Sequence, residues 1–178
     1  MSDGRPTLEG VLDPSFVSTA GQLDIAALRR RRDEAREEEE VLSFVRRWLH
    51  GKMDILRSEL VRRRDGSGPD DLIERLTATL GEGASGGSRG ARSGMPSERL
   101  QTLGGQAVAD IDSSDDLARL PDLTTEQIEA LVQRLVSEER RVSEQRRKVH
   151  HVIDELAAEL TRRYRSGSAS VDDILGGR

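Results

Sequence analysis

Apolar residues in two stretches of the chain recur at alternating intervals of three and four positions. This spacing is typical of an amphipathic α-helix that packs along another helix. We therefore predict two long helices, each with a row of apolar side chains along one face. The first row consists of Leu42, Val45, Leu49, Met53, Leu56 and Leu60, and the second of Leu131, Leu135, Val142, Val149, Ile153, Leu156 and Leu160.

Capping residues and chain breakers mark the ends of both predicted helices. Asp24 is suited to cap the first helix, which should end near Arg64, before a run rich in Gly and Pro. Thr124 and Gln127 form a capping box for the second helix, which should end near Arg165. A helix of about forty residues is roughly 60 Å long, which is too long for an isolated helix in a globular protein.

The two stretches are related by an internal duplication. Residues 38–63 and 138–163 match without a gap at 12 of 26 positions. Two equivalent copies suggest an antiparallel pair with a pseudo-two-fold axis. The predicted fold is therefore all-α, with two long helices in an intramolecular antiparallel coiled coil, a flexible tail and a long linker rich in Gly and Ser.

The chain is predicted to contain five segments. Residues 1–21 form a flexible N-terminal tail, and residues 166–178 form a C-terminal tail. The first helix occupies 22–65 and the second 124–165. Between them, residues 66–123 form a linker that contains a short helix at about 69–80 and a disordered Gly- and Ser-rich segment.

Composition agrees with long helices and excludes several classes of protein. Charged residues make up 34% of the chain and aromatic residues 2%, as in coiled coils. There is no cysteine, which excludes disulfides and thiolate metal sites. No apolar run approaches the roughly 20 residues of a membrane span, and no signal peptide is recognisable. We expect a cytoplasmic protein that binds no membrane, and its net charge of −5 disfavours direct nucleic-acid binding.

Five polar residues recur at the same positions in both copies and lie on one helix face, which flanks the apolar row. Arginine can donate two parallel hydrogen bonds, as a fork, to guanine O6 and N7 or to a phosphate. Aspartate can accept hydrogen bonds from guanine N1–H and N2–H. Each set is thus suited to guanine, and two sets suit a two-fold symmetric ligand such as a cyclic dinucleotide. These polar motifs are Glu39, Ser43, Arg46, His50 and Asp54, and Glu139, Ser143, Arg146, His150 and Asp154.

Other interpretations of the polar motifs are simpler. Their residues can form ion pairs within each helix on a solvated face, as charge runs usually do. The chain would then be a constitutive coiled-coil adaptor or oligomerisation protein without nucleotide dependence. His50 and Asp54 are also spaced as metal ligands can be, but the accompanying serine and arginine do not suit a cation. No metal is expected, and without a nucleophile–base arrangement no enzymatic activity is expected.

The duplicated motif resembles that of the RsiG family of actinobacterial anti-sigma factors, Glu-x3-Ser-x2-Arg-x3-Gln-x3-Asp. Stretches around it, 41–47, 52–60 and 146–164, are also similar to that family. The resemblance implies an antiparallel coiled coil that binds a cyclic di-GMP dimer, one nucleotide per motif, with no other cofactor. The loaded protein would sequester a WhiG-type sigma factor and repress sporulation genes. His50 and His150 stand where the family has glutamine.

Overall fold

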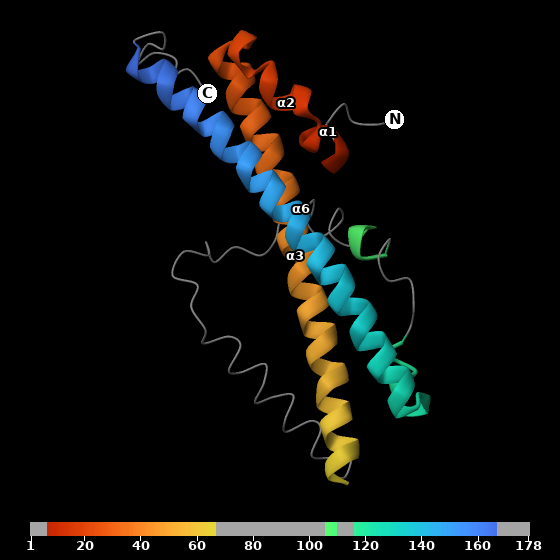
Figure 1. The fold of residues 1–178 in the computed structure, drawn as a ribbon. Coiled ribbons are helices and arrows are strands. Elements are labelled where there is room, and N and C mark those ends of the chain that lie inside the picture. The colour runs from red at the N-terminus through yellow and green to blue at the C-terminus, as the bar shows by residue number, and fades with distance from the viewer. Residues whose placement is uncertain (1–6, 67–105, 110–115, 167–178) are drawn as a thin grey trace. The chain divides into compact units, whose positions relative to one another are not determined.

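The structure, a computed structural model, describes residues 7–66, 106–109 and 116–166 of the chain. Within these ranges the residues form helices and turns and no strand, which confirms the all-α prediction (Figure 1). The elements in chain order are α1 (Leu8–Leu12), α2 (Pro14–Ser18), η1 (Ala20–Gln22), α3 (Ile25–Asp65), η2 (Leu120–Asp122) and α6 (Thr125–Arg165).

The chain divides into two compact units, and both contain part of each long helix. The first unit consists of Met1–Ser43 and Ser143–Arg178, and the second of Phe44–Val142. In the first unit the start of α3 packs against the end of α6, and in the second the end of α3 packs against the start of α6. The two long helices therefore run antiparallel, as predicted.

A buried apolar residue recurs every seven positions along each long helix, which is the repeat of a coiled coil. These ten residues are at most 6% exposed: Leu28, Ala35, Leu42, Leu49 and Leu56 in α3, and Ile128, Leu135, Val142, Val149 and Leu156 in α6. Each residue in α3 has its counterpart 100 positions later, so the duplication extends to the beginning of both helices. The predicted apolar rows are confirmed in the main, although Leu60, Leu131 and Ile153 are only half-buried.

Side-chain caps fix the starts of the long helices where the sequence indicated them. The Asp24 carboxylate accepts from the backbone N–H of Ala27 at 2.6 Å. The Thr124 hydroxyl accepts from the N–H of Gln127 at 3.3 Å, and the Gln127 amide oxygen accepts from the N–H of Thr124 at 2.7 Å. Both predicted caps are thus confirmed, and they satisfy amide groups that the first helical turn leaves unpaired.

The predicted flexible tail is wrong for residues 7–21, because these residues form α1, α2 and η1. Thr7 caps α1, and Asp13 caps α2 directly before Pro14. Val11 is fully buried, and Phe16 packs against the core of the first unit, so burial stabilises helices too short to persist alone. The predicted helix at 69–80, the Gly- and Ser-rich segment and residues 167–178 lie outside the described residues.

The C-terminal end of α6 holds the segment that leads into α3, within the first unit. Arg163 donates to the carbonyl oxygens of Ala20 and Gly21 at 2.9 and 3.0 Å and also to that of Leu23. Glu159 orients this guanidinium through a hydrogen bond of 2.8 Å from Nε. We call this arrangement an arginine clamp.

The second unit contains an equivalent arginine clamp at the C-terminal end of α3. Arg63 donates to the carbonyl oxygens of Leu120 and Leu123, at 3.0 and 2.5 Å, and to Glu59 at 2.6 Å. Arg62 also donates to Glu59, at 2.7 Å. Glu59 is 3% exposed, so its charge depends on these two arginines. The end of each long helix therefore holds the turn that begins the other.

Two glycines in and after α3 are expected to respond in opposite ways to alanine. Gly51 lies inside the helix, and no neighbouring atom lies within 4 Å of the position that a Cβ would occupy, so Gly51→Ala should raise the free energy of unfolding by about 0.5–1 kcal/mol. Gly66 ends the helix with φ of 67°, so Gly66→Ala should lower it by a similar amount, about 1 kcal/mol. Urea unfolding measures both changes, and destabilisation by Gly51→Ala would contradict the expectation.

Candidate functional site

The first unit brings together residues from both polar motifs. The carboxylate Oε1 of Glu39 on α3 accepts from Nε of Arg146 on α6 at 2.7 Å and from the hydroxyl of Ser43 at 2.7 Å. The same Nε lies 2.9 Å from the Ser43 hydroxyl oxygen. His150 completes the cluster, with Nε2 at 3.3 Å from Oε1 of Glu39. We call these four residues the first half-site.

The second unit repeats this arrangement with the two motifs exchanged. Nε of Arg46 on α3 donates to Oε1 of Glu139 on α6 at 3.0 Å. Nε2 of His50 lies 3.4 Å from the same carboxylate oxygen. Arg46, His50 and Glu139 form the second half-site.

The glutamate of each motif therefore pairs with the arginine of the other motif. A glutamate could also reach the arginine of its own motif, at i+7, but the described contacts join opposite helices. Two helical turns separate residues i and i+7 by roughly 10 Å along the axis, whereas the facing helix brings its arginine within 3 Å. The glutamate–arginine ion pairs of the motifs thus join the two helices and do not lie within one helix.

The environment of Glu39 keeps its carboxylate charged. Burial by itself would raise the pKa of Glu39, but hydrogen bonds from Ser43 and Arg146 and the positive charge of Arg146 outweigh it, so the pKa is lowered. The side chain is 18% exposed, compared with 34% for Arg146. The glutamate is therefore a fixed anion that orients a more exposed arginine.

Both motif arginines use only Nε in these contacts. The terminal nitrogens of Arg46 and Arg146 have no hydrogen-bond partner among the described residues. Two parallel N–H groups of this kind match the O6 and N7 edge of guanine or two oxygens of a phosphate. Each half-site thus presents an oriented arginine fork that is available to a ligand.

The imidazole of His50 adds a further polar atom to the second half-site. Its Nε2 is shielded from solvent and makes no hydrogen bond among the described residues, although the side chain as a whole is 45% exposed. A neutral imidazole has one nitrogen that donates and one that accepts, whereas both nitrogens of the charged ring donate. A ligand that reaches the ring can use the exposed edge.

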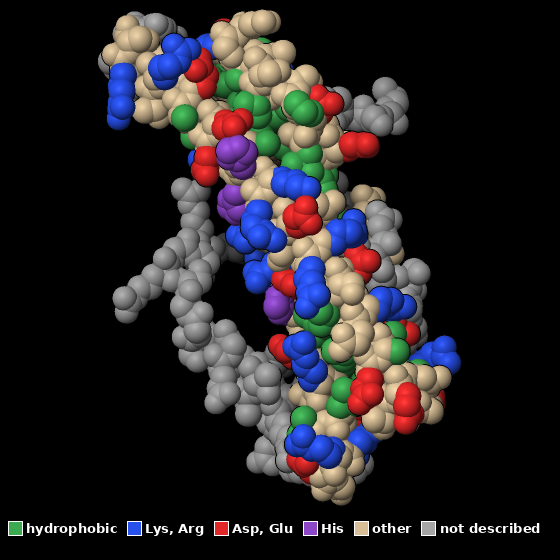
Figure 2. Space-filling view, in the orientation of Figure 1, with side chains coloured by type: hydrophobic (Ala, Val, Ile, Leu, Met, Phe, Trp, Pro, Cys, Tyr) green, Lys and Arg blue, Asp and Glu red, His purple; other side chains and the backbone are tan. Residues whose placement is uncertain are grey.

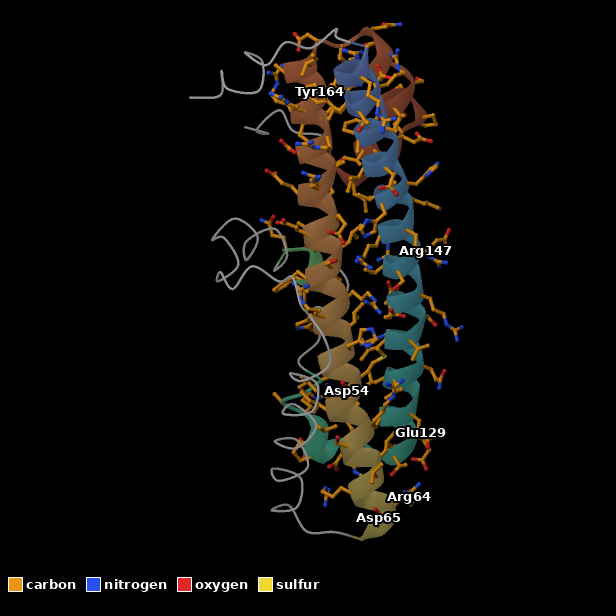
Figure 3. All side chains as sticks on the ribbon, turned by 90° about the vertical axis from the view of Figure 1, so that its left-hand side faces the viewer. Asp54, Arg64, Asp65, Glu129, Arg147 and Tyr164 are labelled. Atoms are coloured by element: carbon orange, nitrogen blue, oxygen red, sulfur yellow. The ribbon has the colours of Figure 1, made fainter. Side chains whose placement is uncertain are left out.

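The motif aspartates lie outside the direct contacts of the half-sites. Asp54, labelled on α3 in Figure 3, is half-exposed and lies 3.8 Å from Arg57, a neighbour that sequence reasoning did not include although its i+3 spacing indicates the contact. Asp154 is exposed and has no ion-pair partner among the described residues. Both carboxylates are therefore accessible to a ligand. Ser143 lies in the first unit and is half-buried.

Charged side chains are dense on the surface of α6. Figure 2 shows Lys and Arg side chains over α6 with acidic side chains between them.

In the described parts of the chain, His, Asp and Glu nowhere form a group of three or more that could hold a metal ion. No helix of the described ranges has the length and apolar character to cross a membrane.

Comparison with known proteins identifies a family. The model of a family described as RsiG-like matches residues 14–80 and 114–176, which together cover more than two thirds of the chain. Among curated proteins none matches. The matched segments contain both long helices and all residues of the two half-sites.

Proposed function

Since this chain belongs to the RsiG-like family of anti-sigma factors, we propose that it binds cyclic di-GMP at the two half-sites and, when loaded, sequesters a WhiG-type sigma factor. The family consists of regulatory proteins that partner sigma factors and are not enzymes. Regulation by the nucleotide and the identity of the sigma factor are the parts that we propose. The physiological outcome would be repression of sporulation or late-development genes.

The oriented arginine forks are the observation that carries this proposal. In each half-site a glutamate from the facing helix holds Nε, so the terminal nitrogens are positioned before a ligand arrives. Preorganised donors of this kind lose little entropy on binding. We propose that Arg46 and Arg146 bind guanine O6 and N7, while Asp54 and Asp154 accept from guanine N1–H and N2–H. Two nucleotides would bind, one for each motif.

The crossed pairing also suggests how the ligand affects the sigma partner. A nucleotide in either half-site would touch residues of α3 and of α6, because each half-site draws on both helices. Binding would stabilise one arrangement of the two helices over others, and a sigma factor that recognises this arrangement would bind more tightly. By linkage, the sigma factor would increase nucleotide affinity by the same factor.

One observation favours a constitutive coiled-coil adaptor instead. The heptad core of ten buried residues and the ion pairs Glu39–Arg146 and Glu139–Arg46 hold the helices together within each unit without a ligand. A partner could then recognise the helix pair at any nucleotide concentration. The two functions differ in whether the sigma complex requires the nucleotide.

Calorimetry on the full chain separates these functions. We expect cyclic di-GMP to bind and cyclic di-AMP, which has the same phosphates but no guanine edge, to bind about 100-fold more weakly or not at all. A WhiG-type sigma factor should bind the loaded protein and not the nucleotide-free protein. Equal affinity for the sigma factor with and without cyclic di-GMP would favour the constitutive adaptor and reject the proposal.

A further inference from the structure

The half-sites lack the positive charge that a cyclic dinucleotide requires. Each motif contributes one arginine and two carboxylates, so with a neutral histidine its net charge is −1. Cyclic di-GMP carries two phosphodiesters, each with one negative charge. If Arg46 and Arg146 bind guanine, the motifs leave the phosphates without a cation. Further basic side chains are therefore needed beside each half-site.

The duplication identifies which basic residue recurs without a structural role. Most identical positions belong to the polar motifs, to the apolar rows or to the arginine clamps, together with Arg62 and Arg162, which donate to the clamp glutamates. Apart from these, only Glu38 and Arg47 recur, as Glu138 and Arg147. The twelve identities in the first copy are Glu38, Glu39, Ser43, Arg46, Arg47, His50, Asp54, Leu56, Glu59, Leu60, Arg62 and Arg63.

Arg47 and Arg147 make no ion pair in the described part of the chain. Both are exposed. The pKa of Glu144 is lowered mainly by Lys148 and to the least extent by the charge of Arg147. Another basic residue beside a half-site, Arg57, lies 3.8 Å from Asp54 and has an alanine as its counterpart at position 157. This arginine therefore occurs in both copies, as Arg47 and Arg147, and neither copy forms an ion pair with a described residue.

Helix geometry places these arginines at the edge of the polar motifs. Residues at i−4 and i+3 are neighbours on a helix surface, so Arg147 lies beside Ser143 and His150. Its Nε is 3.4 Å from the carbonyl oxygen of Ser143, which shows that the side chain lies back along α6 towards the motif serine. Figure 3 shows Arg147 on the exposed surface of α6. Arg47 has the same relation to Ser43 and His50 on α3.

We infer that Arg47 and Arg147 bind the phosphodiester groups of the nucleotide, one arginine at each half-site, and so separate phosphate binding from guanine recognition. This inference rests on the proposed function. Each arginine brings the net charge of its motif from −1 to zero before the ligand binds. Its guanidinium can turn to a phosphate without breaking an ion pair, because it makes none with any residue that the structure describes.

The test compares Arg47→Gln, Arg147→Gln and the double variant with the wild-type chain, by calorimetry with cyclic di-GMP at several ionic strengths. Each single change should weaken binding about tenfold and the double change about 100-fold, as expected for loss of charge-assisted hydrogen bonds. Affinity in the double variant should also depend less on salt. Phosphorus NMR should show a smaller shift of the bound phosphates.

Arg30→Gln is the matched control, because Arg30 is exposed, has no ion pair among the described residues and lies about 180° around α3 from Glu39. It removes the same charge and should leave affinity within about twofold. If the double variant binds like Arg30→Gln, the inference is overturned while the proposed function stands. If the wild-type chain binds no cyclic di-GMP, the proposed function itself fails.

Discussion

Arg146→Gln is expected to weaken cyclic di-GMP binding by about 100-fold, and Arg46→Gln to do the same. Each variant loses the bidentate hydrogen bond that the arginine would make to a guanine edge. The glutamine side chain keeps a polar group but cannot form the fork. Calorimetry on the full chain measures both losses, and circular dichroism checks that helicity is retained. Wild-type affinity in either variant would contradict the role assigned to these arginines.

The crossed pairing makes a sharper form of this prediction possible. In a double-mutant cycle of unfolding free energies, Glu39→Gln and Arg146→Gln should couple by about 1 kcal/mol, as expected for a partly buried ion pair. Glu39→Gln and Arg46→Gln, although both in one motif, should add without coupling. Coupling within the motif and none across the helices would mean that the pairs do not cross.

The arginine clamps should give the second large effect, on stability. Arg163→Met keeps an apolar stem but removes the donors to three carbonyl oxygens and a partner of Glu159. We expect the free energy of unfolding to fall by about 2–3 kcal/mol. Arg165→Met, which removes an exposed arginine without a partner among the described residues, is the control and should change it by less than about 0.5 kcal/mol. Chemical denaturation measures both.

The clamps also predict how stability depends on pH. Hydrogen bonds from Arg62 and then Arg63 lower the pKa of Glu59 to about 2, and Arg162 and Arg163 do the same for Glu159. A lowered pKa in the folded state means that this stability is present above the ordinary value of 4.5 and is lost as the pH falls towards 2.

Unfolding followed between pH 5 and about pH 2 should therefore show stability falling with acid. The fall should be smaller in Glu159→Gln, because this variant has no carboxylate to protonate at that clamp. An equal fall in wild type and variant would show that the clamp carboxylates do not titrate in this range.

The helix pair could be predicted because its signals are local. The helix starts are marked by Asp24, Thr124 and Gln127, whose capping hydrogen bonds join residues three positions apart in the sequence. The apolar rows follow from periodicity, and burial of Leu49 and Leu156 confirms them. Such features depend on the chain's own geometry and not on a distant partner.

The pairing of the motifs could not be predicted in the same way. Which carboxylate meets Arg146 depends on the register of α3 against α6, and no local pattern sets that register. Glu39 of the facing helix and Arg146 are separated by 107 positions in the chain. The sequence therefore indicated residues for the candidate site but not which glutamate meets which arginine.

The order of residues 7–21 was missed for a related reason. Helices of five residues are too short to show a periodic pattern, and their stability comes from burial. Val11 is fully buried, and Phe16 packs against a core that also contains Leu156. Nothing near Phe16 in the sequence indicates this contact, because its partner is a distant helix.

The division of each unit between distant parts of the chain has a consequence during translation. The first unit joins residues up to Ser43 with residues from Ser143 onwards, and the second needs the start of α6. A nascent chain that has emerged only as far as α3 exposes its apolar row and has no half-site. Neither unit can be completed until the ribosome has made α6, so products truncated before that helix should bind neither nucleotide nor sigma factor.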